Sequence, residues 1–148
     1  PARPEAEYDI AIGGLGRDLL IVDASLETAA VNLTSGGLNY SVTSVSGRFH
    51  VEASEFELID LKTGSGADRL TGAGNKDKLF AGAGNDTVGG GAGRDTLDGG
   101  RGSDVISGGL DKDDLTGGAG RDVFDFDDVA ESAARLPDMI HDFLTGTD

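Results

Sequence analysis

The 148-residue chain has no cysteine and no tryptophan, and aromatic residues make up only 5% of it. Without cysteine there is no disulfide, no thiolate ligand for zinc and no cysteine nucleophile. Apolar residues amount to 37%, which is material for a thin core only. We therefore expect the fold to need a source of stability besides packing and cross-links.

Positive charge is scarce too, because 12 Lys and Arg face 27 Asp and Glu and give a formal net charge of −15. This charge argues against a nucleic-acid partner and favours hard cations. No apolar run approaches the roughly 18 residues of a membrane span, so we expect no transmembrane segment. Residues 1–12 carry Glu5, Glu7 and Asp9 in place of the basic start and apolar stretch of a secretory signal peptide.

Motifs of catalysis are missing as well. The sequence contains no Gly-x-Ser-x-Gly elbow, no Walker loop and no complete Gly-x-Gly-x-x-Gly run. The histidines, His50 and His141, form no His-Glu-x-x-His pattern, and we interpret both as structural. We expect no enzyme here, with any catalytic part outside this segment. The alternative is a β-helix of the kind that polysaccharide-acting enzymes use.

Glycine, in contrast, occurs at 25 positions, most of them in a strict nine-residue repeat from Thr63 to Asp125. Seven units follow without a gap and read TGSGADRLT, GAGNKDKLF, AGAGNDTVG, GGAGRDTLD, GGRGSDVIS, GGLDKDDLT and GGAGRDVFD. The eighth position of each unit is apolar: Leu70, Leu79, Val88, Leu97, Ile106, Leu115 and Phe124. The sixth is always aspartate.

Each unit predicts a tight turn followed by a minimal strand. Glycine permits positive φ angles and close backbone contact in the turn, and only the middle side chain of the strand faces inward. Two units complete one turn of a flattened coil, with neighbouring coils about 4.8 Å apart. The predicted fold is all-β, a right-handed parallel β-roll or β-helix.

Aspartates 18 residues apart then stack in two columns. The first column is Asp68, Asp86, Asp104 and Asp122, and the second is Asp77, Asp95 and Asp113. Carboxylates about 5 Å apart repel each other, so a cation must lie between them, and Ca²⁺ accepts both carboxylate and carbonyl oxygens. One ion per stacked pair predicts about five Ca²⁺, three in the first column and two in the second. The expected carbonyl ligands belong to Gly64, Gly66, Gly82, Gly84, Gly90, Gly91, Gly93, Gly99, Gly100, Gly102, Gly108, Gly109, Gly117, Gly118 and Gly120.

The unit Gly-Gly-x-Gly-x-Asp-x-apolar-x closely resembles the RTX (repeats-in-toxin) calcium-binding repeat over residues 63–125. Residues 13–21, GGLGRDLLI, match the same pattern and place Asp18 at the calcium position. The tail resembles the closing segment of serralysin-type secreted proteases, with Asp138, Ile140, Asp142, Phe143, Gly146 and Asp148. The resemblance implies a calcium-bound β-roll, type I secretion, folding outside the cell, and a secreted or cell-surface location.

Two units depart from the pattern, and both belong to the second column. The second position is Ala73 in one unit, and the fourth position is Asn75 there and Asp111 in another. We expect these turns still to form, because Asn and Asp tolerate the left-handed conformation, but with weaker calcium sites. Asp18 lacks a stacked acid, since Gly36 stands near the required place, and Glu27 is the expected substitute.

The chain divides into three predicted parts. Residues 1–62 form a flanking β region with the isolated repeat, 63–125 form the β-roll, and 126–148 form a C-terminal cap that is cut short relative to the resembling proteins. Alternating apolar residues in 22–62 favour degenerate coils of the same β-helix, and a small β-sandwich is the alternative. Acids, alanines and then Pro137 predict a short helix over 128–135.

Two functions fit these features. The first is a calcium-dependent folding and export module of a larger secreted protein, disordered at low calcium and monomeric. The second is a calcium-stiffened structural or adhesive module, which would self-associate or bind a surface when calcium is present.

Overall fold

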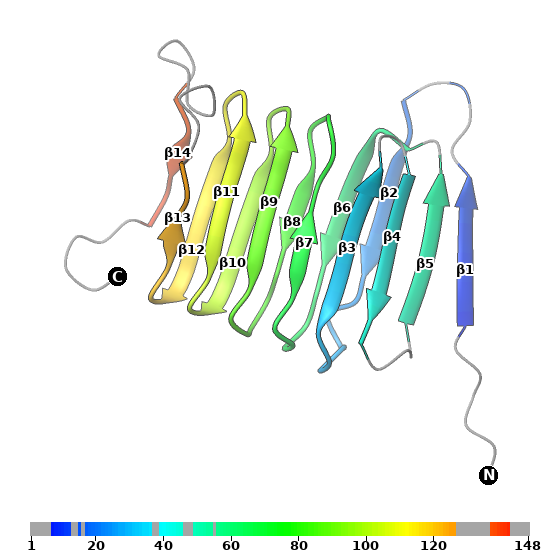
Figure 1. The fold of residues 1–148 in the computed structure, drawn as a ribbon, viewed down its shortest axis with the longest axis horizontal. Coiled ribbons are helices and arrows are strands. Elements are labelled where there is room, and N and C mark those ends of the chain that lie inside the picture. Colours follow the sequence, from blue (N-terminus) through cyan, green and yellow to red (C-terminus); the bar gives the residue numbers. More distant parts are fainter. Residues whose placement is uncertain are drawn as a thin grey trace.

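The computed structural model describes residues 7–12, 15, 17–36, 39–45, 49–54, 56–126 and 137–142. These residues form an all-β parallel β-solenoid of about four turns, whose coils stack along the long axis of the molecule (Figure 1). No helix occurs among them, and so none that is long and apolar enough to cross a membrane. The helix predicted over 128–135 lies outside the described residues.

Two sheets form the walls of the solenoid. The eight-stranded sheet has the order β1 (Glu7–Ile12), β5 (Phe49–Ser54), β4 (Asn39–Ser44), β3 (Val31–Gly36), β7 (Arg69–Thr71), β9 (Thr87–Ala92), β11 (Val105–Leu110) and β13 (Val123–Phe124). The six-stranded sheet has the order β14 (Met139–Ile140), β12 (Asp114–Gly120), β10 (Thr96–Gly102), β8 (Lys78–Phe80), β6 (Leu58–Lys62) and β2 (Leu19–Asp23).

Successive coils of the repeat stack in parallel with the predicted step of 18 residues. In one sheet Leu70 pairs with Val88 and Val88 with Ile106, and in the other Leu79 pairs with Leu97. The eighth-position side chains from Leu70 to Leu115 are at most 1% exposed and line the core between the sheets. The prediction of one inward apolar side chain per unit is confirmed for these six units.

Strands β2, β3, β4 and β6 bury two apolar residues each, where a repeat strand buries one. Leu33 of β3 pairs with Leu70, so Val31, two residues earlier, lies at the level of the repeat aspartate. Ile59 of β6 has the same place in the other sheet, and both side chains are buried. Apolar contacts here replace the buried carboxylates of the repeat.

Strands β3, β4 and β5 form an antiparallel meander, with Leu33 opposite Val42 and Val42 opposite Val51. Only residues 37 and 38 separate β3 from β4, and a parallel crossover needs a longer connection. The prediction that residues 22–62 form further coils of the β-helix is therefore wrong for β4 and β5. The sequence did not reveal this, because parallel and antiparallel strands share the same alternation of apolar residues. The division into domains stays a prediction.

Candidate metal sites

The repeat aspartates lie where each turn enters a strand, and six of them are buried with exposures from 0 to 3%: Asp68, Asp77, Asp86, Asp95, Asp104 and Asp113. They face the interior because the sixth position, two residues before the apolar eighth, points to the same side of the strand. A buried ionised carboxylate is costly unless hydrogen bonds or a cation compensate it.

One oxygen of each aspartate is bonded to the preceding coil. The backbone N–H of the aspartate 18 residues earlier donates to Oδ1 over 2.7 to 3.0 Å, in the pairs Asp68–Asp86, Asp77–Asp95, Asp86–Asp104, Asp95–Asp113 and Asp104–Asp122. At the N-terminal ends of the columns the donors are Val31, to Asp68, and Ile59, to Asp77. The aspartates therefore stack in the two columns that their spacing predicts.

The other oxygen has no hydrogen-bond partner in most of the column. Within the described part of the chain, Oδ2 is buried without a partner in Asp68, Asp86, Asp95, Asp104 and Asp113. A buried acceptor left unpaired costs about 1–3 kcal/mol, and more when it is charged. A row of such oxygens fits a divalent cation.

The first-position glycines border these oxygens. A Cβ added at Gly90 would meet both the Oδ2 of Asp95 and the carbonyl oxygen of Gly108 in the next coil. Gly72 stands in the same relation to Asp77 and to the carbonyl of Gly90. Carboxylate and carbonyl oxygens from adjacent coils thus approach one point that only glycine leaves open. Both are ligand types that Ca²⁺ takes, so the donor set fits the ion.

The turn of the second unit differs from the later ones. Neither Ala73 nor Asn75, at its second and fourth positions, has a positive φ. Asp111, at the fourth position of the sixth unit, adopts φ +79°, which confirms that aspartate takes the left-handed conformation of glycine there. Asp77, in the same unit, accepts bonds from Ile59 N–H at 3.0 Å and Ala73 N–H at 2.9 Å. Protein groups therefore satisfy both of its oxygens.

Burial makes the stacked carboxyls hard to ionise in the absence of a cation. Desolvation, reinforced by stacked neighbours, raises the pKa of Asp86 to about 7, of Asp95 to about 8 and of Asp113 to about 6. Burial also raises the pKa of other repeat aspartates, namely Asp68, Asp77 and Asp104. A cation held between the coils would oppose this effect by favouring the ionised form.

Asp18 lies outside both columns. Leu20 pairs with Ile59, so Leu20 and not Asp18 occupies the aspartate level of its coil. The backbone N–H of Asp18 instead donates to the carboxylate of Glu57 at 2.7 Å. The sequence pointed to Glu27 instead, because Glu27 lies one period of nine residues after Asp18. Glu57 lies 39 residues after Asp18, which does not fit that period. A metal role for Asp18 stays a prediction.

The fifth position gives the two columns different surroundings. Beside the second column stand Lys76, Arg94 and Lys112, one per coil, whereas the matching places beside the first column are Ala67, Asn85, Ser103 and Arg121. In the linear sequence these basic residues look irregular, but the coil places three of them on one edge. Sequence reasoning missed this basic row.

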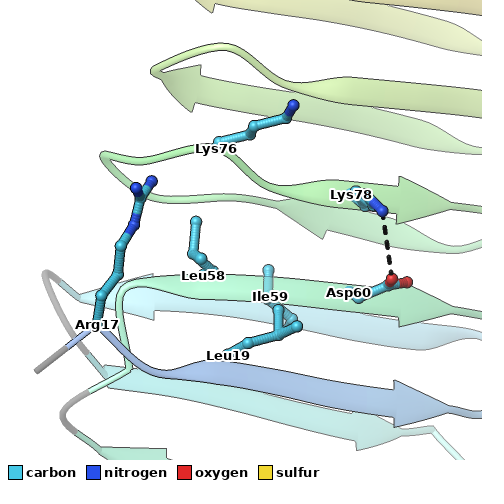
Figure 2. Close-up of a pocket in the computed structure, with 7 residues that line it drawn as sticks. All are labelled: Arg17, Leu19, Leu58, Ile59, Asp60, Lys76 and Lys78. Atoms are coloured by element: carbon cyan, nitrogen blue, oxygen red, sulfur yellow. Dashed lines mark ion pairs between the residues drawn. The ribbon is translucent and has the colours of Figure 1, made fainter.

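A pocket of about 340 Å³ lies at the N-terminal end of the basic row (Figure 2). It is lined by Arg17, Leu19, Leu58, Ile59, Asp60, Lys76 and Lys78. Lys78 forms an ion pair with Asp60 at 3.9 Å, drawn as the dashed line in Figure 2. No repeat aspartate lines the pocket, so it is separate from the metal columns.

Within the described ranges, no three Asp, Glu or His side chains gather as a metal-binding group. Any calcium site in the columns therefore depends on backbone carbonyls in addition to stacked carboxylates. This requirement agrees with the glycine-rich turns, which bring carbonyl groups of adjacent coils close together.

Comparison with known families gives one match. The model of the RTX calcium-binding nonapeptide repeat, which spans four copies, matches residues 60–88 and again residues 89–124. These ranges contain all seven aspartates of the two columns. No curated protein matches the chain.

Proposed function

Because residues 60–124 are RTX calcium-binding nonapeptide repeats, we propose that this β-roll holds Ca²⁺ between its stacked turns and folds fully only when the ions are bound. The RTX repeat is a structural calcium-binding module, not a catalytic one. The observation that carries the proposal is the row of buried carboxylates in which one oxygen is bonded to the preceding coil and the other has no partner.

The ligands proposed for each ion are the carboxylates of two successive aspartates in a column and glycine carbonyls of the turns beside them. Three gaps in the first column and two in the second give about five ions from the repeats. Five divalent ions add +10 to the formal charge of −15 and leave −5. The two sites of the second column are the weaker ones, because Asp77 is already satisfied and the basic row repels cations.

Calcium binding is coupled to folding in this proposal. A repeat strand contributes one buried apolar residue to the core, and its other inward position is an aspartate. So little apolar surface does not offset the entropy of ordering a glycine-rich chain while the carboxylates repel one another. The binding free energy of the ions is then part of the folding free energy.

The biological setting follows from the family. Proteins with RTX repeats are typically secreted, and calcium is scarce inside cells and abundant outside. We propose that the segment stays expanded until type I export delivers it to external calcium, where it folds as a soluble monomer and supports its parent protein.

The test is a calcium titration of chelated protein followed by far-ultraviolet circular dichroism, with magnesium as the control. We expect a cooperative gain of β signal with calcium only. Full β signal before calcium is added would contradict the proposal. Sedimentation of the same samples separates the monomer from the adhesive alternative, which requires self-association with calcium.

A further inference from the structure

The pocket at the N-terminal end of the basic row has an apolar floor on the outer face of the six-stranded sheet. Leu19 of β2 and Leu58 of β6 lie opposite each other in the parallel pair of strands, and both line the pocket. Leu19 is 50% exposed, although the outward positions of a half-buried strand are usually polar. A ligand that covers this apolar surface would gain free energy by removing it from water.

Three cationic side chains line the same pocket. Arg17 stands two residues before β2, Lys76 belongs to the turn before β8, and Lys78 is the first residue of β8. The single acid among the described lining residues, Asp60, pairs with Lys78 at 3.9 Å. Three cations and one carboxylate leave a local charge of +2, on a chain whose formal net charge is −15.

Arg17 and Lys76 are the cations that face the pocket without a partner. Among the described residues neither forms an ion pair, and both side chains are exposed. Figure 2 shows the guanidinium of Arg17 beside Leu58, below the turn that carries Lys76. An anionic group in the pocket would accept charge-assisted hydrogen bonds from these side chains.

Lys76 is not needed to compensate the buried aspartate of its own turn. Asp77 already accepts hydrogen bonds from the N–H groups of Ile59 at 3.0 Å and Ala73 at 2.9 Å, so protein groups satisfy both of its oxygens. The charge of Lys76 is therefore directed at something other than the second column.

We propose that this pocket binds a small organic anion, a carboxylate with a short aliphatic chain. The carboxylate contacts Arg17 and Lys76, and the chain lies on Leu19 and Leu58. A volume of about 340 Å³ lies near the lower end of the range of ligand pockets, roughly 300–1,000 Å³, which restricts the ligand to a few carbon atoms. No repeat aspartate is among the lining residues, so this site does not depend on the proposed calcium ligands.

The test uses hexanoate, titrated into the protein in saturating calcium and followed by amide chemical shifts in NMR. We expect saturable shifts in β2, β6 and the turn of Lys76, with a Kd on the order of 1 mM. Acetate lacks the chain and hexylammonium has the opposite charge, so both should bind at least about tenfold more weakly. Absence of saturable shifts with hexanoate, or equal binding of either control compound, would overturn the proposal.

Two variants test the cations. Arg17→Gln and Lys76→Gln should each weaken hexanoate binding by roughly fivefold. Arg121→Gln is the matched control, because Arg121 is exposed and has the same fifth position in its unit as Lys76, but does not line the pocket. It should bind hexanoate as the wild type does. Unchanged affinity in the first two variants, or an equal loss in Arg121→Gln, would overturn the proposal. The amide spectra of the same samples establish that the variants are folded.

Discussion

The two carboxylate oxygens of each repeat aspartate face different neighbouring coils. Its Oδ1 accepts a hydrogen bond from the backbone of the preceding coil, and in most of the column its Oδ2 remains for a ligand toward the following coil. A carboxylate provides both acceptors from one short side chain. This division explains why every unit has aspartate at the sixth position while its other polar positions vary.

The position of an aspartate in its column sets how many ions it contacts. Asp104 is stacked between Asp86 and Asp122, whereas Asp68 is stacked below Val31. We predict that Asp104→Ala loses two Ca²⁺ and Asp68→Ala loses one, as counted by equilibrium dialysis. Equal losses, or equal shifts of the calcium midpoint, would contradict the column arrangement.

The raised pKa values predict how the calcium-free fold responds to pH. Burial lifts the pKa of Asp86 to about 7 and of Asp95 to about 8, from an ordinary value near 4. The folded chain then binds more protons than the unfolded chain between about pH 4 and 8, so its stability falls as the pH rises through this range. Circular dichroism in chelator should therefore show less β signal at pH 8 than at pH 5.

Calcium should change this response. The ion competes with protons for the same carboxylates, so its affinity should rise with pH over the same interval. A calcium-free stability that is flat or rises between pH 5 and pH 8 would show that these carboxyls are not buried as described.

Glycine is required at particular turn positions only. Gly102 has φ +140°, and a Cβ there would collide with the carbonyl oxygen of Gly84 in the preceding coil. We predict that Gly102→Ala destabilises the calcium-bound protein by about 1–3 kcal/mol in urea unfolding. Gly74→Ala is the control, because nothing lies within 4 Å of its added Cβ, and it should change stability by less than about 1 kcal/mol. Similar losses of stability in both variants would contradict a requirement for glycine at particular turn positions.

At the scale of strands and coils, a fixed period made the columns and the core predictable. Wherever an insertion changes the period, the prediction stops: Glu57 lies 39 residues from Asp18, and Asp138 lies 25 residues from Asp113. The direction of the strands was not predictable either, since β4 alternates like a parallel strand but pairs antiparallel with β3. These features depend on where the chain turns back, which apolar alternation does not encode.

The basic row predicts that the two columns respond differently to charge removal. Arg94 is adjacent to Asp95 in the second column, so Arg94→Ser should strengthen calcium binding there by roughly threefold at low salt and less at high salt. Lys62→Ser, on the outer face of β6, is the control and should have no effect on affinity. Calorimetric titration at two ionic strengths measures both variants. A weaker or salt-independent effect of Arg94→Ser would contradict this role of the row.

For the whole molecule, the solenoid has an apolar end and a carboxylate-rich end. Val31 and Ile59 bring buried apolar side chains to the level at which the repeat has aspartates. We predict that, in chelator, backbone amides of β3, β4 and β6 exchange hydrogen more slowly than those of β9 to β12. Calcium should then protect the repeat strands as well. Uniform fast exchange in chelator would show that the N-terminal part also depends on the ions.

The central claim is that cations lie between stacked aspartates in both columns. A crystal structure of the calcium-loaded protein, with anomalous scattering to identify the ions, tests it most directly. The account predicts Ca²⁺ density between Asp68 and Asp86, Asp86 and Asp104, and along the second column, coordinated by carboxylates and glycine carbonyls. Calcium found only at surface acids, with the column oxygens bonded to protein or water alone, would contradict the account.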